Sequence, residues 1–68
     1  MIVQFFDYDD DTLILEQDVS VIPRIGETVH FSGKKWTHSG FKVKTVDWHF
    51  KAGDDGKPTG WPVVRITV

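Results

Sequence analysis

Four aspartates near the start of the chain have the spacing of a calcium-binding loop. Positions 1, 3, 5 and 12 of a twelve-residue frame are held by Asp7, Asp9, Asp11 and Asp18, and carboxylate oxygens are the ligands that Ca²⁺ takes in such loops. The frame also needs glycine at position 6, where the chain has Thr12, and it needs flanking helices. The flanking residues alternate like strands instead. We therefore interpret these aspartates as a solvated turn and assign no metal and no cofactor to the chain.

The other polar residues form no catalytic pattern. His30, His38 and His49 have neither the helical nor the knuckle spacing of a metal site, and only Asp47 and His49 would share a strand face. The serines lie outside a Gly-x-Ser-x-Gly turn, and the turn at Gly33 opens a strand, whereas a phosphate-binding loop opens a helix. A chain of 68 residues also has little volume for a cleft. The sequence predicts that the protein is not an enzyme.

A basic and aromatic segment, residues 34–51, could bind single-stranded nucleic acid. Proteins that do so combine a cationic groove with rings on which bases stack. The candidate residues are Lys34, Lys35, Trp36, Lys42, Lys44 and Lys51. Against this interpretation, the net charge is −2 and every charged residue within 1–20 is acidic, whereas nucleic-acid modules are usually basic. Nucleic-acid binding is therefore the alternative function.

Apolar residues on both faces of two predicted strands favour a protein partner. A domain of this size has one core, so one apolar set on each strand lies near the surface, where aromatic residues typically anchor interfaces. The predicted interface residues are Ile2, Phe6, Trp61 and Val63. The partner would be another protein or a second copy of the chain. Coverage of these residues by the loops of a closed barrel is the alternative interpretation.

The elements that position these residues are predicted to be strands, because the apolar spacing is mostly two. The predicted strands cover about 1–8, 12–20, 28–32, 35–51 and 61–68. The fourth is expected to be interrupted near Gly40 and to contain a β-bulge near Thr45, and residues 53–60 form a hairpin loop. The expected buried cluster is Val29, Phe31, Val43, Val46, Trp48, Val64 and Ile66.

Bulk properties limit the class of protein. The 68 residues make one domain, 1–68, and the absence of cysteine excludes disulfides and thiolate metal sites. No apolar run approaches the roughly 20 residues that a membrane-spanning helix needs, and no secretion leader is recognisable. A cytoplasmic location is expected.

Residues 20–50 resemble known small barrels. The segment Pro23-Arg24-Ile25-Gly26-Glu27-Thr28-Val29, followed by a glycine turn and a strand that ends in Trp48, resembles Src-homology-3-like barrels. It is also similar to single-domain proteins of phages and integron cassettes, most of which lack an assigned activity. The resemblance implies a fold and a mobile genetic element, and it implies no active site.

Together these observations predict an all-β protein: a five-stranded antiparallel small barrel or open roll, Src-homology-3-like, with little or no helix. The predicted function is non-catalytic binding of a protein or of a second copy. Single-stranded nucleic-acid binding through 34–51 remains the alternative.

Overall fold

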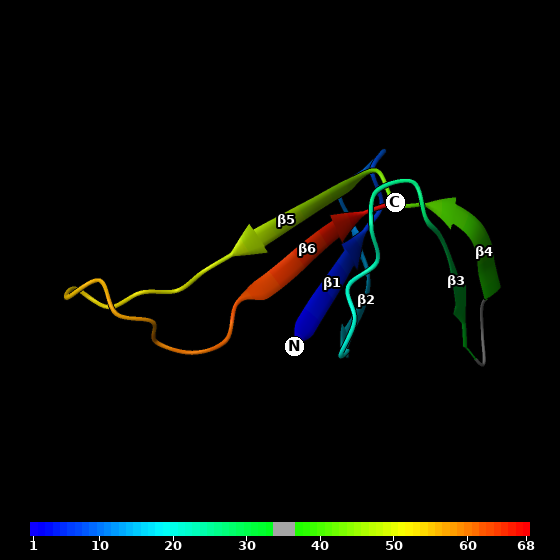
Figure 1. The fold of residues 1–68 in the computed structure, drawn as a ribbon. Helices are drawn as coiled ribbons and strands as arrows, with labels where there is room; N and C mark the ends of the chain where they lie inside the picture. Colours follow the sequence, from blue (N-terminus) through cyan, green and yellow to red (C-terminus); the bar gives the residue numbers. More distant parts are fainter. Residues whose placement is uncertain (34–36) are drawn as a thin grey trace.

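The chain folds into short strands joined by turns and one long hairpin connection (Figure 1). The computed structural model describes residues 1–33 and 37–68. Within these ranges there is no helix, and therefore none that could cross a membrane. The strands are β1 (Ile2–Phe6), β2 (Leu13–Asp18), β3 (Thr28–Ser32), β4 (Thr37–Lys42), β5 (Thr45–His49) and β6 (Val63–Thr67). The all-β class with little or no helix is confirmed.

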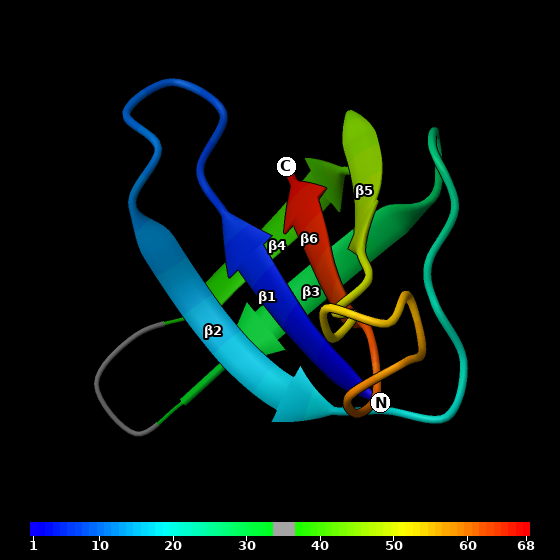
Figure 2. The same ribbon diagram turned by 90° about the vertical axis from the view of Figure 1, so that its left-hand side faces the viewer.

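Two sheets form the molecule. The larger has the strand order β2-β1-β6-β5, and β3 and β4 make a separate antiparallel hairpin. The β3–β4 hairpin lies against one face of the larger sheet, as the two views of the ribbon show (Figures 1 and 2). β1 pairs with β2 in antiparallel and with β6 in parallel orientation. Because β1 and β6 are parallel, the expected all-antiparallel arrangement is wrong, and so is the expected number of five strands. Six strands are described, and no pairing among them closes the two sheets into a barrel.

The predicted fourth strand, 35–51, is two strands in different sheets. Its break lies at Val43, where the backbone changes partners. Gly26 N–H donates to Val43 O (2.9 Å) and Val43 N–H donates to Glu27 O (2.8 Å), but the next amide, Lys44 N–H, donates to Thr67 O (2.8 Å). A change of hydrogen-bonding partner, and not the expected bulge near Thr45, turns the chain from one sheet to the other.

Near Gly40, where an interruption was expected, the strand is irregular but not broken, since β4 runs continuously over Thr37–Lys42. The register between β3 and β4 shifts between Val29 and Phe31, on the strand opposite Gly40. Gly40 has a φ of 79°, a left-handed conformation that glycine adopts without steric cost. Its N–H donates to Nδ1 of His30 (3.2 Å), so an outward-pointing side chain of β3 supports this irregularity.

The core lies between the sheets. Its buried side chains are Val3, Phe5, Phe31, Val43, Val64, Ile66 and Val68. Phe5 and Phe31 join the two layers in an edge-to-face contact, with ring centroids 5.0 Å apart and an interplanar angle of 72°. Four residues of the expected cluster are buried, and Val29 and Val46 pack against them half-buried.

Trp48 was expected in this cluster, and that prediction is wrong, since 45% of the residue is exposed. The predicted side of the strand is correct, because Trp48 pairs with Val64 of β6, which is fully buried. The end of β5 runs away from β3 and β4 (Figure 1). Trp48 therefore points to the core side of the sheet at a place where the second layer no longer covers it.

From Trp48 onward the chain forms a projecting hairpin, residues 48–62, which includes the end of β5 and is called here the arm. The arm is closed by an isolated bridge between Ala52 and Pro58. Gly53 N–H donates to Lys57 O (2.9 Å) and Thr59 N–H donates to Lys51 O (3.1 Å). The predicted loop 53–60 lies at its tip. The arm gives the molecule its elongated shape, with extents of 43 × 24 × 23 Å.

Candidate protein-interaction surface

Three large aromatic side chains of the arm are in solvent. Trp48, Phe50 and Trp61 are 45%, 75% and 82% exposed. Trp48 and Phe50 are two residues apart, so their side chains share the core-side face of β5. Their rings stack with centroids 6.1 Å apart and an interplanar angle of 12°. Exposure rises along this face from half-buried Val46 through Trp48 to Phe50. The row of apolar side chains that begins in the core at Val46 is thus exposed to solvent at its far end.

A pocket of about 590 Å³ lies in the arm beside this row. Apolar groups dominate its walls, with Phe50, Pro58, Trp61 and Pro62 among them, and Lys51 is the charged residue at its edge. Because Phe50 both stacks on Trp48 and lines the pocket with Trp61, the three aromatic residues form one continuous surface. We call Trp48, Phe50 and Trp61 together the aromatic surface.

Trp61 also lines a second pocket, of about 340 Å³, at the start of β1. The other walls come from both strands at one end of the β1–β2 pair, where β1 begins and β2 ends, and include Met1, Ile2, Asp18 and Val19. Here the terminal ammonium group donates to Asp18 and, at 3.1 Å, to the carbonyl oxygen of Val19. The ion pair fixes the start of β1 beside Trp61.

The four predicted interface residues fall into two groups. Ile2 and Trp61, which are far apart in sequence, line the same pocket, and Ile2 is 38% exposed. Phe6 and Val63 are half-buried. The guanidinium of Arg65 lies over the Phe6 ring, 3.8 Å from its centroid, so this ring is covered within its own chain. The sequence did not single out Trp48 and Phe50 as surface residues, because their spacing is that of core residues.

The predicted basic row is not one surface. Lys34, Lys35 and Trp36 lie outside the described residues. The exposed residues Lys42, Lys44 and Lys51 belong to β4, to the link between the sheets and to the arm. The Lys44 ammonium lies over the Tyr8 ring, 4.7 Å from its centroid. The basic middle of the sequence therefore meets the acidic turn in space.

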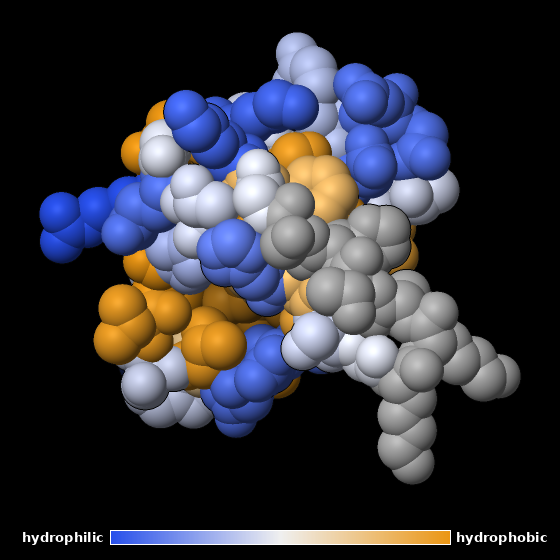
Figure 3. Space-filling view, turned by 90° about the vertical axis from the view of Figure 1, so that its right-hand side faces the viewer, coloured by the Kyte–Doolittle hydropathy of each residue, from blue (hydrophilic) through white to orange (hydrophobic). Residues whose placement is uncertain are grey.

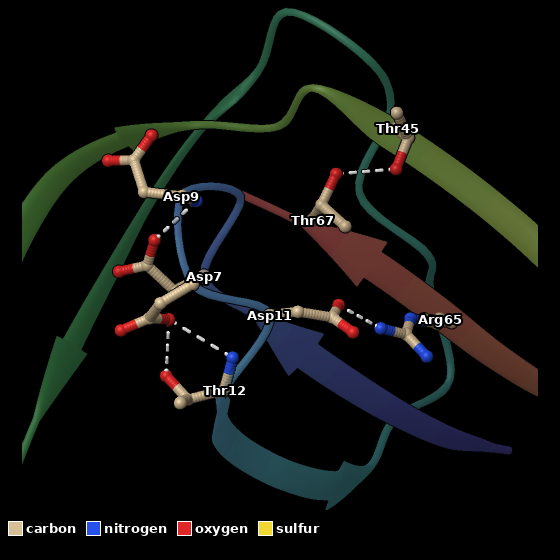
Figure 4. Close-up of polar contacts among 8 residues, drawn as sticks. Asp7, Asp9, Asp11, Thr12, Thr45, Arg65 and Thr67 are labelled. Carbon is tan, nitrogen blue, oxygen red and sulfur yellow. Dashed lines mark hydrogen bonds and ion pairs between the residues drawn. The ribbon is translucent and has the colours of Figure 1, made fainter.

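The acidic turn is held by donors of its own chain (Figure 4). Asp9 N–H donates to Asp7 Oδ1 (2.8 Å), and Arg65 donates to Asp11, which has a left-handed φ of 58°. These contacts are what an Asx-type turn uses to bend a chain. Among the described residues no three His, Asp or Glu side chains gather as a metal site would need.

Asp10 is also hydrogen-bonded within the acidic turn. Its Oδ1 accepts hydrogen bonds from the hydroxyl group (2.7 Å) and the amide (3.1 Å) of Thr12. The hydroxyl contact first, and the amide contact second, lower the pKa of this exposed carboxyl group below its ordinary value. The lowered pKa thus reflects turn formation.

A second set of exposed apolar residues provides a comparison for the aromatic surface. Apolar side chains also gather at one edge of the face that carries β3 and β4, while polar side chains cover much of the rest (Figure 3). Val21 and Ile25, in the segment between β2 and β3, are 78% and 68% exposed. Single aliphatic residues on a connecting segment are common on protein surfaces, whereas stacked aromatic residues beside an apolar pocket are not.

Comparison with known proteins gave no relative: no protein family, curated protein or solved structure matches this chain.

Proposed function

We propose that this chain is a non-catalytic module that binds a protein chain through the aromatic surface of its arm. The observation that carries the proposal is that Phe50 and Trp61 line one apolar pocket and that Trp48 stacks on Phe50 beside it. At the stated exposures these side chains present on the order of 400 Å² to solvent. Contiguous apolar areas of this size on small soluble domains commonly mark interaction sites.

The type of residue supports a protein partner. Tryptophan is enriched among the few residues that carry most of the energy of an interface, and such residues sit in or beside pockets. Here Trp61 stands between two pockets, of about 590 and 340 Å³. Ile2, a predicted interface residue, lies in the smaller one. The interface that we propose therefore extends from the arm to the start of β1.

Selection from a displayed random-peptide library tests this function. The target is the wild-type protein, and the arm variant Phe50→Ser/Trp61→Ser removes two rings. Val21→Ser/Ile25→Ser is the matched control, because these residues are about as exposed and lie elsewhere. We expect enriched peptides to bind the wild type and the control with similar affinity and to lose at least tenfold on the arm variant. Peptides that bind all three proteins equally, or no enrichment on a wild-type protein that is monomeric at the concentration used, would contradict the proposal.

Single-stranded nucleic-acid binding is the second candidate. It is favoured by Lys51, which lies beside Phe50 at the pocket edge, because stacking rings next to a cation are what single strands need. The contact between Lys44 and Tyr8 argues the other way, since it places one predicted phosphate ligand against the acidic turn. Protein binding is therefore the function that we prefer.

The finer fold assignment and the setting are also proposals. The resemblance of residues 20–50 to Src-homology-3-like barrels and to phage and integron-cassette proteins stays a prediction, as does the cytoplasmic location. Lysate fractionation with an antibody against the protein would test the location.

A further inference from the structure

We infer that the partner of the arm is a second copy of this chain, joined by antiparallel pairing of β5 with β5 of the copy, with a two-fold axis at Trp48. This inference rests on the proposed function and names its partner. The pairing would extend the four-stranded sheet of one copy directly into that of the other. It would also bring the two core-side rows of β5 together.

The first step is that β5 is available. It stands at the end of the sheet order β2-β1-β6-β5 and, in the part of the chain that the structure describes, pairs with β6 alone. An edge strand presents backbone N–H and C=O groups to which another strand can bind. The opposite edge, β2, is less suitable for pairing with its own copy, because Glu16 and Asp18 would bring carboxylates together.

The second step is that the register is restricted by side-chain direction. Directly opposed residues of antiparallel strands point to the same side. The apolar rows of two copies therefore face the same side only when the two-fold axis passes through a residue and not between two residues. An axis at Asp47 would oppose that carboxylate to its own copy, which is unfavourable for a charged group.

An axis at Trp48 gives complementary pairs instead. It places Asp47 opposite His49 of the second copy, so that an imidazole N–H can donate to a carboxylate, and it does so twice. On the core side it places Trp48 opposite Trp48 of the copy and Val46 opposite Phe50 of the copy. A strand with an acid and a base on either side of an aromatic residue is complementary to itself when the axis passes through that residue, which is the property of a two-fold interface.

The third step concerns area. The aromatic surface exposes on the order of 400 Å² in each chain. Pairing at β5 acts on Trp48 and Phe50, which expose on the order of 240 Å² per chain and so on the order of 500 Å² in the two copies, before the paired backbone is counted. Specific interfaces begin at about 1,200 Å² in total. The two rings of each copy account for part of this area, and contact between the paired backbones and along the arms must supply the rest.

The experiment uses the absence of cysteine from the chain. Asp47→Cys and His49→Cys are made as separate proteins and oxidised gently, each alone and as a mixture. In the proposed register these positions face each other, with Cβ atoms about 4.5–5.5 Å apart, whereas identical positions are diagonal, about 7–8 Å apart. A disulfide needs about 3.5–4.5 Å. We expect a cross-linked dimer from the mixture, at least tenfold more than from either protein alone. The other Asp47–His49 pair stays intact in the mixed dimer.

Sedimentation velocity of the wild type gives the second measurement. We expect a dimer at about 100 μM, a monomer for Trp48→Ser/Phe50→Ser, and a dimer for the control Val21→Ser/Ile25→Ser. A monomeric wild type, or cross-linking that is as strong in a single-variant sample as in the mixture, would overturn the inference. If that monomer still selects peptides through its arm, the proposed function stands without self-association. If it selects none, both fail.

Discussion

Arg65 and Phe6 are neighbours on the outer face of the sheet: the guanidinium carbon lies 3.8 Å from the centre of the ring. The same guanidinium donates to Asp11 of the acidic turn. Because β6 and β1 are parallel and adjacent, the last strand of the chain thus fixes the turn that follows the first. One side chain both covers an apolar ring and compensates a carboxylate.

We expect Arg65→Ala to lower the free energy of unfolding by about 1 kcal/mol, the sum of a lost cation–π contact and a lost exposed ion pair. Urea unfolding measures it. Arg65→Lys is the control, because lysine keeps the charge but not the planar group that lies over the ring. A lysine variant as stable as the wild type would show that stacking on Phe6 contributes nothing.

Because Trp48 is partly exposed, we expect its truncation to lower the free energy of unfolding less than truncation of a buried residue on the same side of the sheet. Ile66 is fully buried, so Ile66→Ala should cost about 2–5 kcal/mol. Trp48 is 45% exposed, and Trp48→Ala in dilute, monomeric protein should cost about 1–2 kcal/mol despite its larger side chain. Thermal and urea unfolding compare the two variants. A larger loss for the tryptophan variant would place its ring inside the core.

The acidic turn makes a prediction about pH. The Thr12 hydroxyl group lowers the pKa of the Asp10 carboxyl group, so Thr12→Val should move that pKa back up toward the ordinary value. The folded pKa is lower than the unfolded one. The ionised group therefore favours the folded state above the unfolded pKa, and this contribution is lost as the pH falls through the folded pKa.

Carbon-detected NMR titration of the Asp10 carboxyl group measures this change. Thr28→Val, a change on an exposed strand residue elsewhere, is the control and should leave the titration unaltered. An unchanged Asp10 titration in Thr12→Val would mean that the amide contact alone sets the pKa.

Nucleic-acid binding is tested by its dependence on salt. Each phosphate contact to a single strand lowers the affinity by about 0.7 log units per log unit of salt. We expect no detectable binding of a short single-stranded or double-stranded oligonucleotide at about 50 mM salt, because Lys44 lies against the acidic turn. Binding that weakens steeply with salt, and is lost equally for all sequences in Lys42→Glu/Lys44→Glu, would favour the alternative function.

The sequence by itself determined most of the strand segments and the apolar side of the last strand. Alternation is a local property, so β1, β2, β3 and β6 lie within their predicted ranges, and Val64 and Ile66 are buried as predicted. Gly40 was likewise recognisable as the site of an irregularity, because its conformational freedom is a property of the residue itself.

The tertiary structure decided what covers each apolar side. Trp48 and Phe50 have the spacing of core residues, yet they are exposed, because the β3–β4 layer ends before the arm does. The break at Val43 depends on the backbone groups from elsewhere in the chain that bond to it. The shared pocket of Ile2 and Trp61 depends on the parallel β1–β6 pair, and the contact of Lys44 with Tyr8 depends on the position of the acidic turn. Alternation states the direction of a side chain, whereas burial depends on how far the opposing layer extends, which no local pattern encodes.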